Sequence, residues 1–365
     1  MSSSSSSPSR QSRKAASLSR VYYSNAVYFP NHKIYNGHTP GGLNYSCIST
    51  VYYCFAHVST DGGVFLSDEY ADARAPCDGV SGGLGSLMHL KQKHPHLQVI
   101  LSIGGGNASQ VFPTVAGSAV LRDNFARSAR GLVEASGFDG IDIVWQYPAD
   151  RLQGANFLAL LAAVRMYLPE EHYLLTTALP ASRVVLGNID LRRAADYLDL
   201  LNLMAYDFYG HWTSRSGHHS QLYPSSSKED ESFCGAGMIA HLVSQGFPAR
   251  KVLLGIPLFG RSFPGVTSPG HRFSKPSGDG TLEYHQLPRK GTKEHVDKRA
   301  GAAYCVSGGS TGFTSYDNPE TVKMKAAFVK QKGLGGLFYW TAPADSKDSK
   351  RSLVAAGFRA LHSSG

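Results

Sequence analysis

The 365-residue sequence has no long hydrophobic run, few cysteines and fewer acidic than basic residues. Nothing in it approaches the roughly 20 consecutive apolar residues that a membrane-spanning helix needs, so we expect no membrane partner. The amino terminus is not followed by an apolar segment, so the sequence does not predict a secretory signal peptide. We therefore expect a cytoplasmic protein, or an extracellular one that is released by a non-classical route.

Cysteine is scarce and irregularly spaced. The five residues are Cys47, Cys54, Cys77, Cys234 and Cys305. An odd number without a signal peptide favours reduced thiols inside a cell over a disulfide framework. There is no Cys-x-x-Cys and no histidine pair at metal-ligand spacing, so we expect neither a metal nor a cofactor.

The formal charge of +9 comes from 36 Lys and Arg against 27 Asp and Glu, and it is unevenly distributed. Residues 1–20 contain four basic residues and no acid, and they begin with a serine run. We predict a disordered tail there, and an organellar transit peptide is the less favoured alternative. The remainder is mildly basic without a Lys/Arg stripe, so we expect no nucleic-acid partner. We expect a monomer.

Strand-like and helical patterns alternate from residue 21 to residue 362. Ser118 is suited to cap a helix that Gly137 ends. Eight strand-like apolar runs occur, at residues 21–29, 50–58, 98–106, 138–145, 172–180, 198–207, 251–260 and 334–340. Eight β-then-α units predict an α/β fold, a (β/α)₈ TIM barrel. A doubly wound open sheet is the alternative, but no Gly-x-Gly-x-x-Gly turn follows the first strand.

One stretch, residues 263–316, interrupts this alternation. It is rich in Gly, Ser and Pro, contains short strand-like pieces, and is too long for an ordinary βα loop. We predict a small α+β insertion between the seventh and eighth barrel strands.

The strand at residues 138–145 carries isolated polar residues within an apolar run. Asp142, Val144 and Gln146 occupy alternate positions, so their side chains point to one side of the strand about 6.6 Å apart. In a barrel, the last of them lies at the carboxyl end of the strand, where barrel enzymes place their chemistry.

Several motifs resemble glycoside hydrolase family 18, the chitinases and their relatives. They are Leu-Ser-Ile-Gly-Gly at 101–105, Leu-Met-Ala-Tyr-Asp at 203–207, Gly-Ile-Pro-Leu-Phe-Gly-Arg-Ser at 255–262 and Gly-Gly-Leu-Phe-Tyr-Trp at 335–340. Their order also matches, and the resemblance covers nearly all of residues 21–361. The chain most resembles fungal chitinases, and the resemblance implies a groove for chitin or chito-oligosaccharides. The insertion resembles the one that forms a wall of this groove in many members.

The fourth-strand motif of this family is altered here. The family pattern Asp-x-x-Asp-x-Asp-x-Glu is matched by Asp139 and Asp142, but Val144 stands at the third Asp and Gln146 at the Glu. In the family the Glu is the general acid, and the preceding Asp orients the N-acetyl group that attacks the anomeric carbon. Glutamine has no acidic proton and valine accepts no hydrogen bond. We therefore expect normal hydrolysis to fail.

The rest of the expected site is carried over from the resemblance. Tyr206 matches the tyrosine that binds the acetamide carbonyl, and Asp207 matches the neighbouring acid that contacts the sugar. Trp340 matches the indole under the reacting sugar. After Ser-Ile-Gly-Gly the family often has a tryptophan, but this chain has Gly106 at that position. The expected lining residues are Tyr23, Phe55, Arg261 and Trp212. Asp142 is either a ligand contact or a satisfied buried acid, and Asp139 has the strand parity of a structural acid.

Three functional hypotheses follow. The first is a non-hydrolytic binder of chitin-like oligosaccharides. The second is an active or weakly active chitinase, in which Asp207 or Asp142 would supply the acid. The third is a structural or partner-binding barrel. The altered strand favours the first hypothesis.

Overall fold

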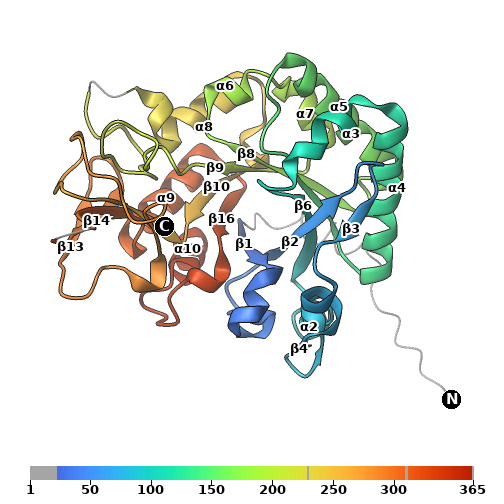
Figure 1. Ribbon diagram of the computed structural model, residues 1–365, viewed down its shortest axis with the longest axis horizontal. Coiled ribbons are helices and arrows are strands. Elements are labelled where there is room, and N and C mark those ends of the chain that lie inside the picture. Colours follow the sequence, from blue (N-terminus) through green and yellow to red (C-terminus); the bar gives the residue numbers. More distant parts are fainter. Residues whose placement is uncertain (1–22, 228–229, 309–310, 364–365) are drawn as a thin grey trace.

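The computed structural model describes residues 23–227, 230–308 and 311–363, so the predicted tail at residues 1–20 lies outside it. Eight parallel strands form a closed barrel (Figure 1), which confirms the predicted fold class. Around the barrel they are β1 (Ser24–Pro30), β2 (Thr50–Val58), β6 (Gln98–Gly104), β7 (Gly140–Val144), β8 (Leu174–Pro180), β9 (Leu200–Met204), β10 (Val252–Pro257) and β16 (Gly336–Trp340). Parallel pairing of β16 with β1 closes the ring.

Helices surround this barrel. They are α2 (Gly82–Lys93), α3 (Phe112–Gly117), α4 (Ala119–Ser136), α5 (Arg151–Tyr167), α6 (Arg183–Leu186), α7 (Leu191–Tyr197), α8 (Gly235–Ser244), α9 (Pro319–Lys332) and α10 (Leu353–His362). The Ser118 side chain accepts a hydrogen bond from the backbone of Leu121 at the start of α4, and Gly137 ends this helix in the left-handed conformation. Both capping predictions are confirmed. Among the described residues, no helix combines the length and apolar character needed to cross a membrane.

The first β/α unit departs from the predicted alternation. The segment between β1 and β2 contains two 3₁₀ helices, at Asn31–Asn36 and Pro40–Gly42, in place of an α-helix. Pro40, Gly41 and Gly42 follow one another there, and both residue types disfavour an α-helix. After β2 the chain adds β3 (Val64–Leu66), which is antiparallel to β2, and a small hairpin of β4 (Pro76–Cys77) and β5 (Val80–Ser81).

The insertion is an antiparallel sheet beside the barrel (Figure 1). It consists of β11 (Phe259–Phe263), β12 (Thr281–Glu283), β13 (Glu294–Asp297), β14 (Ala302–Val306) and β15 (Phe313–Tyr316), in the order β12-β11-β15-β14-β13. Helical structure among its described residues is limited to one 3₁₀ turn, Tyr284–Gln286. Arg351, just before α10, holds the insertion through two 2.9 Å contacts with Glu294.

Two apolar clusters fill the molecule. The larger one lies between the strands and the helices and includes Phe125, Phe157 and Trp145. The smaller one lies inside the barrel and contains Ala26, Tyr28, Tyr52, Cys54, Ile100, Leu253 and Phe338. Alternation explains this division, because successive residues of a strand face opposite sides. All five cysteines lie in the described ranges, where they are buried and form no disulfide with one another.

Candidate functional site

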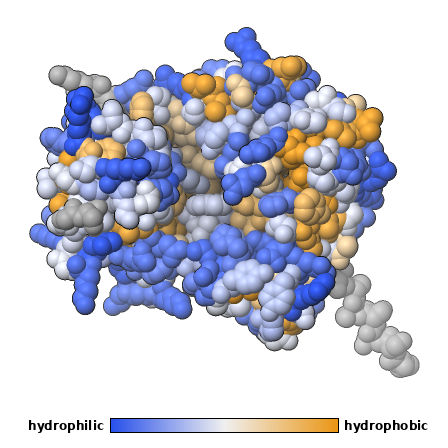
Figure 2. All heavy atoms as spheres, viewed as in Figure 1, coloured by the Kyte–Doolittle hydropathy of each residue, from blue (hydrophilic) through white to orange (hydrophobic). Residues whose placement is uncertain are grey.

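A cavity of about 700 Å³ opens at the carboxyl ends of the barrel strands, and Figure 2 shows the hollow near the centre of this face. Residues from six of the barrel strands line it, together with residues from β11 and β12 of the insertion and from the connecting segments. They include Tyr28, Phe55, Val144, Gln146, Tyr147, Ala178, Ser182, Arg183, Met204, Tyr206, Asp207, Phe233, Phe259, Arg261, Asp279, Thr281, Phe338 and Trp340. This is the end of the barrel at which such folds carry their functional residues.

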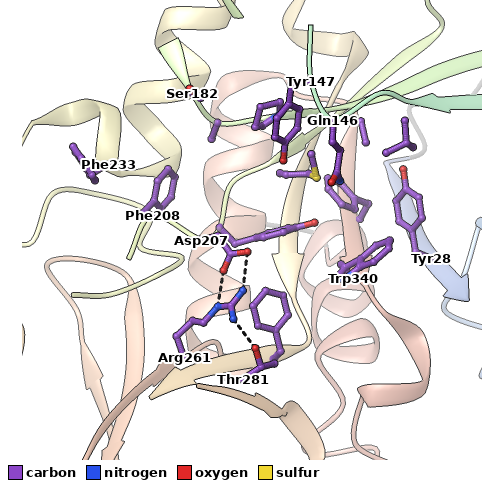
Figure 3. Close-up of a pocket in the computed structure, with 18 of the residues that line it drawn as sticks. Tyr28, Gln146, Tyr147, Ser182, Asp207, Phe208, Phe233, Arg261, Thr281 and Trp340 are labelled. Carbon is purple, nitrogen blue, oxygen red and sulfur yellow. Dashed lines mark hydrogen bonds and ion pairs between the residues drawn. The ribbon is translucent and has the colours of Figure 1, made fainter. Parts of the chain in front are cut away.

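Val144 and Gln146 both line the cavity, at the end of β7 and just after it. The backbone N–H of Gln146 donates to the Ser109 hydroxyl at 2.8 Å, which fixes the chain where it leaves the strand. The Gln146 side chain points into the cavity between Tyr147 and Tyr28 (Figure 3). A Cβ atom on Gly106 would lie 3.1 Å from the side-chain amide oxygen of Gln146, so the glycine leaves room for the Gln146 side chain.

Asp142 lies below the cavity in the barrel interior and is fully buried. Strand register places it between Ser102 of β6 and Thr176 of β8, and both hydroxyls donate to its carboxylate at 2.7 Å. Tyr28 donates a third hydrogen bond at 2.9 Å. Burial raises the pKa of Asp142, although these three donors oppose the shift. Of the two roles left open for Asp142, the structure supports the satisfied buried acid.

Asp207 lies just after β9 and contacts Arg261 of β11 in the wall of the cavity (Figure 3). The guanidinium makes two contacts with the carboxylate, Nε to Oδ1 at 2.8 Å and Nη2 to Oδ2 at 3.1 Å. Arg261 also donates to the Thr281 hydroxyl at 2.5 Å. Burial alone would raise the pKa of Asp207, but His219 and Arg261 outweigh it and lower the pKa to about 2. The carboxylate is therefore ionised near neutral pH.

Aromatic rings form the other side of the cavity. The Trp340 ring lies 5.2 Å from Tyr28 and 5.9 Å from Phe55 between centroids. Tyr206 packs edge-on against Phe259 and Phe338. Such a site combines apolar ring faces with a few fixed polar groups, which is the usual composition of a small-molecule or saccharide site.

The structure brings together Val144, Gln146, Tyr206, Asp207, Phe55, Arg261 and Trp340, as expected. The expectation for Tyr23 is wrong: it precedes β1 at the opposite end of the barrel and packs against the larger apolar cluster. Tyr28 lines the cavity instead, and its inward position could have been read from its spacing to Ala26. Trp212 is half exposed and lies at the rim, with its ring 5.1 Å from the Arg261 guanidinium.

Other lining residues were not anticipated because they come from connecting segments. Ser182, Arg183 and Phe233 belong to loops and a short helix whose position depends on the folded barrel. Asp139 has the structural role that its parity indicated. Its carboxylate pairs with Lys91 at 2.6 Å and accepts from the backbone of Val99 at 2.8 Å.

Comparisons with known proteins agree with this geometry. The sequence model of glycosyl hydrolases family 18 matches residues 21–345. Endochitinase 1 of Metarhizium robertsii is 37% identical over 93% of this chain and 85% of its own length, and Chitinase 1 of Aphanocladium album is 35% identical over 93% and 86%. A solved GH18 chitinase from Cycas revoluta, in complex with (GlcNAc)3, is 25% identical, with a TM-score of 0.80 over 93% of this chain and 99% of its own. The chain belongs to glycosyl hydrolases family 18.

Proposed function

We propose that this protein binds chitin-like oligosaccharides of N-acetylglucosamine in the barrel cavity and does not hydrolyse them at a normal rate. The observation that carries the proposal is the pairing of Val144 and Gln146 at the carboxyl end of β7, where a family 18 chitinase needs two carboxyl groups. The amide of Gln146 can donate a hydrogen bond to a glycosidic oxygen, but it cannot transfer a proton to it.

The remaining acids do not replace the missing one. Among the described residues, the carboxylates that line the cavity are Asp207 and Asp279. Burial would raise the pKa of Asp279, but hydrogen bonds from Thr281 and the charge of Arg261 lower it, as the partners of Asp207 lower that of Asp207. Both are ionised at neutral pH and have no proton to give. Asp142 has a raised pKa, but three hydroxyl groups enclose it below the cavity.

Saccharide recognition does not need the missing carboxyl groups. Trp340 and Phe55 offer ring faces to the apolar face of a sugar, and the Tyr206 hydroxyl is available to an acetamide carbonyl. The Asp207 carboxylate accepts hydrogen bonds from sugar hydroxyls, and Arg261 holds it in place. Because Val144 stands where the family has an aspartate, the acetamide N–H of the sugar has no acceptor at this position. This weakens binding of the central sugar without abolishing it.

Two other functions remain alternatives. A weak chitinase would need an acid that reaches the glycosidic oxygen, and its support is that the curated relatives are named chitinases. A barrel that binds a protein partner would not need the aromatic lining of the cavity.

Isothermal titration of the purified protein with chitohexaose tests the proposal. We expect a saturable binding heat that returns to baseline after each injection. Sustained heat flow, together with the appearance of shorter oligosaccharides in the calorimeter cell, would show turnover and contradict the proposed loss of hydrolysis. An absence of heat at two temperatures would contradict saccharide binding.

A further inference from the structure

A second depression, of about 480 Å³, lies beyond the rim of the barrel cavity. It is lined by His211, Thr213, Ser214, Arg272, Phe273 and Lys275. These residues come from two segments, the connection after β9 and the loop between β11 and β12. No residue of the depression belongs to the cavity described above.

Hydrogen bonds between the two segments give this depression a defined shape. The Ser216 backbone N–H donates to the carbonyl of His271 at 2.8 Å, and its own carbonyl accepts from Gly270 at 2.8 Å. Arg215 donates to the Gly270 carbonyl at 2.7 Å. Phe273 packs edge-on against buried Phe263 of β11, with centroids 4.9 Å apart.

The two charged groups of the depression, on Arg272 and Lys275, are donors only. Arg272 and Lys275 are exposed and form no ion pair with any described residue, and the lining set contains no Asp or Glu within the described ranges. Thr213 uses its hydroxyl to bind the carbonyls of Gly210 and Arg215. Lysine and arginine carry no acceptor, so a neutral sugar, whose hydroxyls also need acceptors, matches this lining poorly. An oxyanion needs donors alone and matches it well.

The depression is connected to the barrel cavity through two residues. The Asp279 carbonyl accepts a hydrogen bond from the Nδ1 atom of His211 at 3.2 Å, and Asp279 also lines the cavity. Trp212 lies between His211 and Thr213 in the chain, and its ring is 5.1 Å from the guanidinium of Arg261. The depression and the barrel cavity therefore adjoin each other at His211, Trp212 and Asp279.

We propose that this depression, named here the basic subsite and comprising His211, Ser214, Arg272 and Lys275, binds an oxyanion carried by the saccharide in the barrel cavity. The class of group is a sulfate, phosphate or carboxylate. The inference rests on the proposed function, because the saccharide brings the anion to the subsite. It adds that the ligand of this protein is an acidic oligosaccharide in preference to plain chitin.

The test compares chitohexaose with 6-O-sulfated chitohexaose by isothermal titration at about 20 mM salt, where surface charges are weakly screened. We expect the sulfated ligand to bind about fivefold more tightly, because each exposed pair contributes modestly. The preference should disappear in the double variant Arg272→Gln and Lys275→Gln, and it should shrink in about 0.3 M salt. The matched control, Arg193→Gln with Lys323→Gln, removes the same charge from α7 and α9 and should keep the preference.

Equal affinity for both ligands in the unmodified protein, or an unchanged preference in the Arg272 and Lys275 variant, would overturn the basic subsite and leave the proposed function standing. If neither oligosaccharide binds, the proposed function fails, and inorganic sulfate becomes the probe. Sulfate binding that is lost in the Arg272 and Lys275 variant, but kept in the control, would still support the subsite. No difference between these variants would overturn it.

Discussion

The Asp207 carboxylate and the Arg261 guanidinium form a two-point ion pair, with contacts of 2.8 and 3.1 Å, that joins the end of β9 to the inserted sheet. Asp207 adopts a positive φ of 61°, which is uncommon for a residue other than glycine. Such a backbone conformation persists where the surroundings hold it, and the ion pair supplies one such restraint. The pair fixes a charged acceptor in the cavity and keeps it ionised.

Replacing Arg261 with glutamine should destabilise the protein in a pH-dependent way. The folded pKa of Asp207, about 2, is below the ordinary pKa of an aspartate, 3.8, so the stabilisation from its charge is present above pH 4 and is lost as the pH falls towards 2. Because 35% of the Asp207 side chain is exposed, solvent screening reduces the effect and we expect about 1 kcal/mol. Denaturant unfolding of both proteins at pH 7 and near pH 2 measures it. Equal losses at the two pH values would show that the charge of Asp207 does not matter.

Replacing Trp340 with alanine should weaken chitohexaose binding by about 30-fold while leaving the fold intact, because a central aromatic contact is lost. Trp340→Phe should retain part of the affinity, since a smaller ring face remains. Calorimetric titration gives the affinity and circular dichroism checks the fold. The control is Tyr35→Ala, an exposed aromatic outside the cavity. Undiminished affinity in Trp340→Ala would place the sugar elsewhere.

Restoring the two acids together, Val144→Asp with Gln146→Glu, should create chitinase activity. General acid catalysis contributes about 100-fold or more, so the double variant should exceed the parent by at least that factor. Each single variant should remain far less active, because one supplies a proton and the other orients the acetamide group. Release of a fluorescent aglycone from a chito-oligosaccharide is the measurement. A folded double variant that binds chitohexaose but turns nothing over would show that the cavity has lost catalytic geometry in other places.

Replacing Asp142 with alanine should destabilise the protein by about 3 kcal/mol, because the hydroxyls of Tyr28, Ser102 and Thr176 lose their acceptor in a fully buried place. Asp142→Asn should cost less, since the amide keeps one acceptor and the hydroxyls can rotate to accept from its NH₂ group. Denaturant unfolding at neutral pH measures both. If the alanine variant were as stable as the parent, water would have to replace the carboxylate.

Strand spacing and the motifs of the sequence alone determined the barrel, the positions of its eight strands and the altered pair at residues 144 and 146. These features are local: a period of two places a strand residue inside or outside, and helix caps act within a few residues. The strand period places Tyr28 on the same face of β1 as Ala26, but the sequence analysis expected Tyr23, which precedes this strand, in the cavity.

Tertiary structure decided which groups meet across the barrel. The three donors of Asp142 come from β1, β6 and β8, and their meeting depends on strand register. Asp207 and Arg261 are 54 positions apart in the chain, and the ion pair that helps to lower the pKa of Asp207 forms once the inserted sheet packs beside β9. The basic subsite has the same origin, since residues 211–214 and 272–275 are brought together by backbone hydrogen bonds between two loops. Local pattern sets the position of each side chain on its element, whereas pairing between distant elements sets its charge, its partners and its access to a ligand.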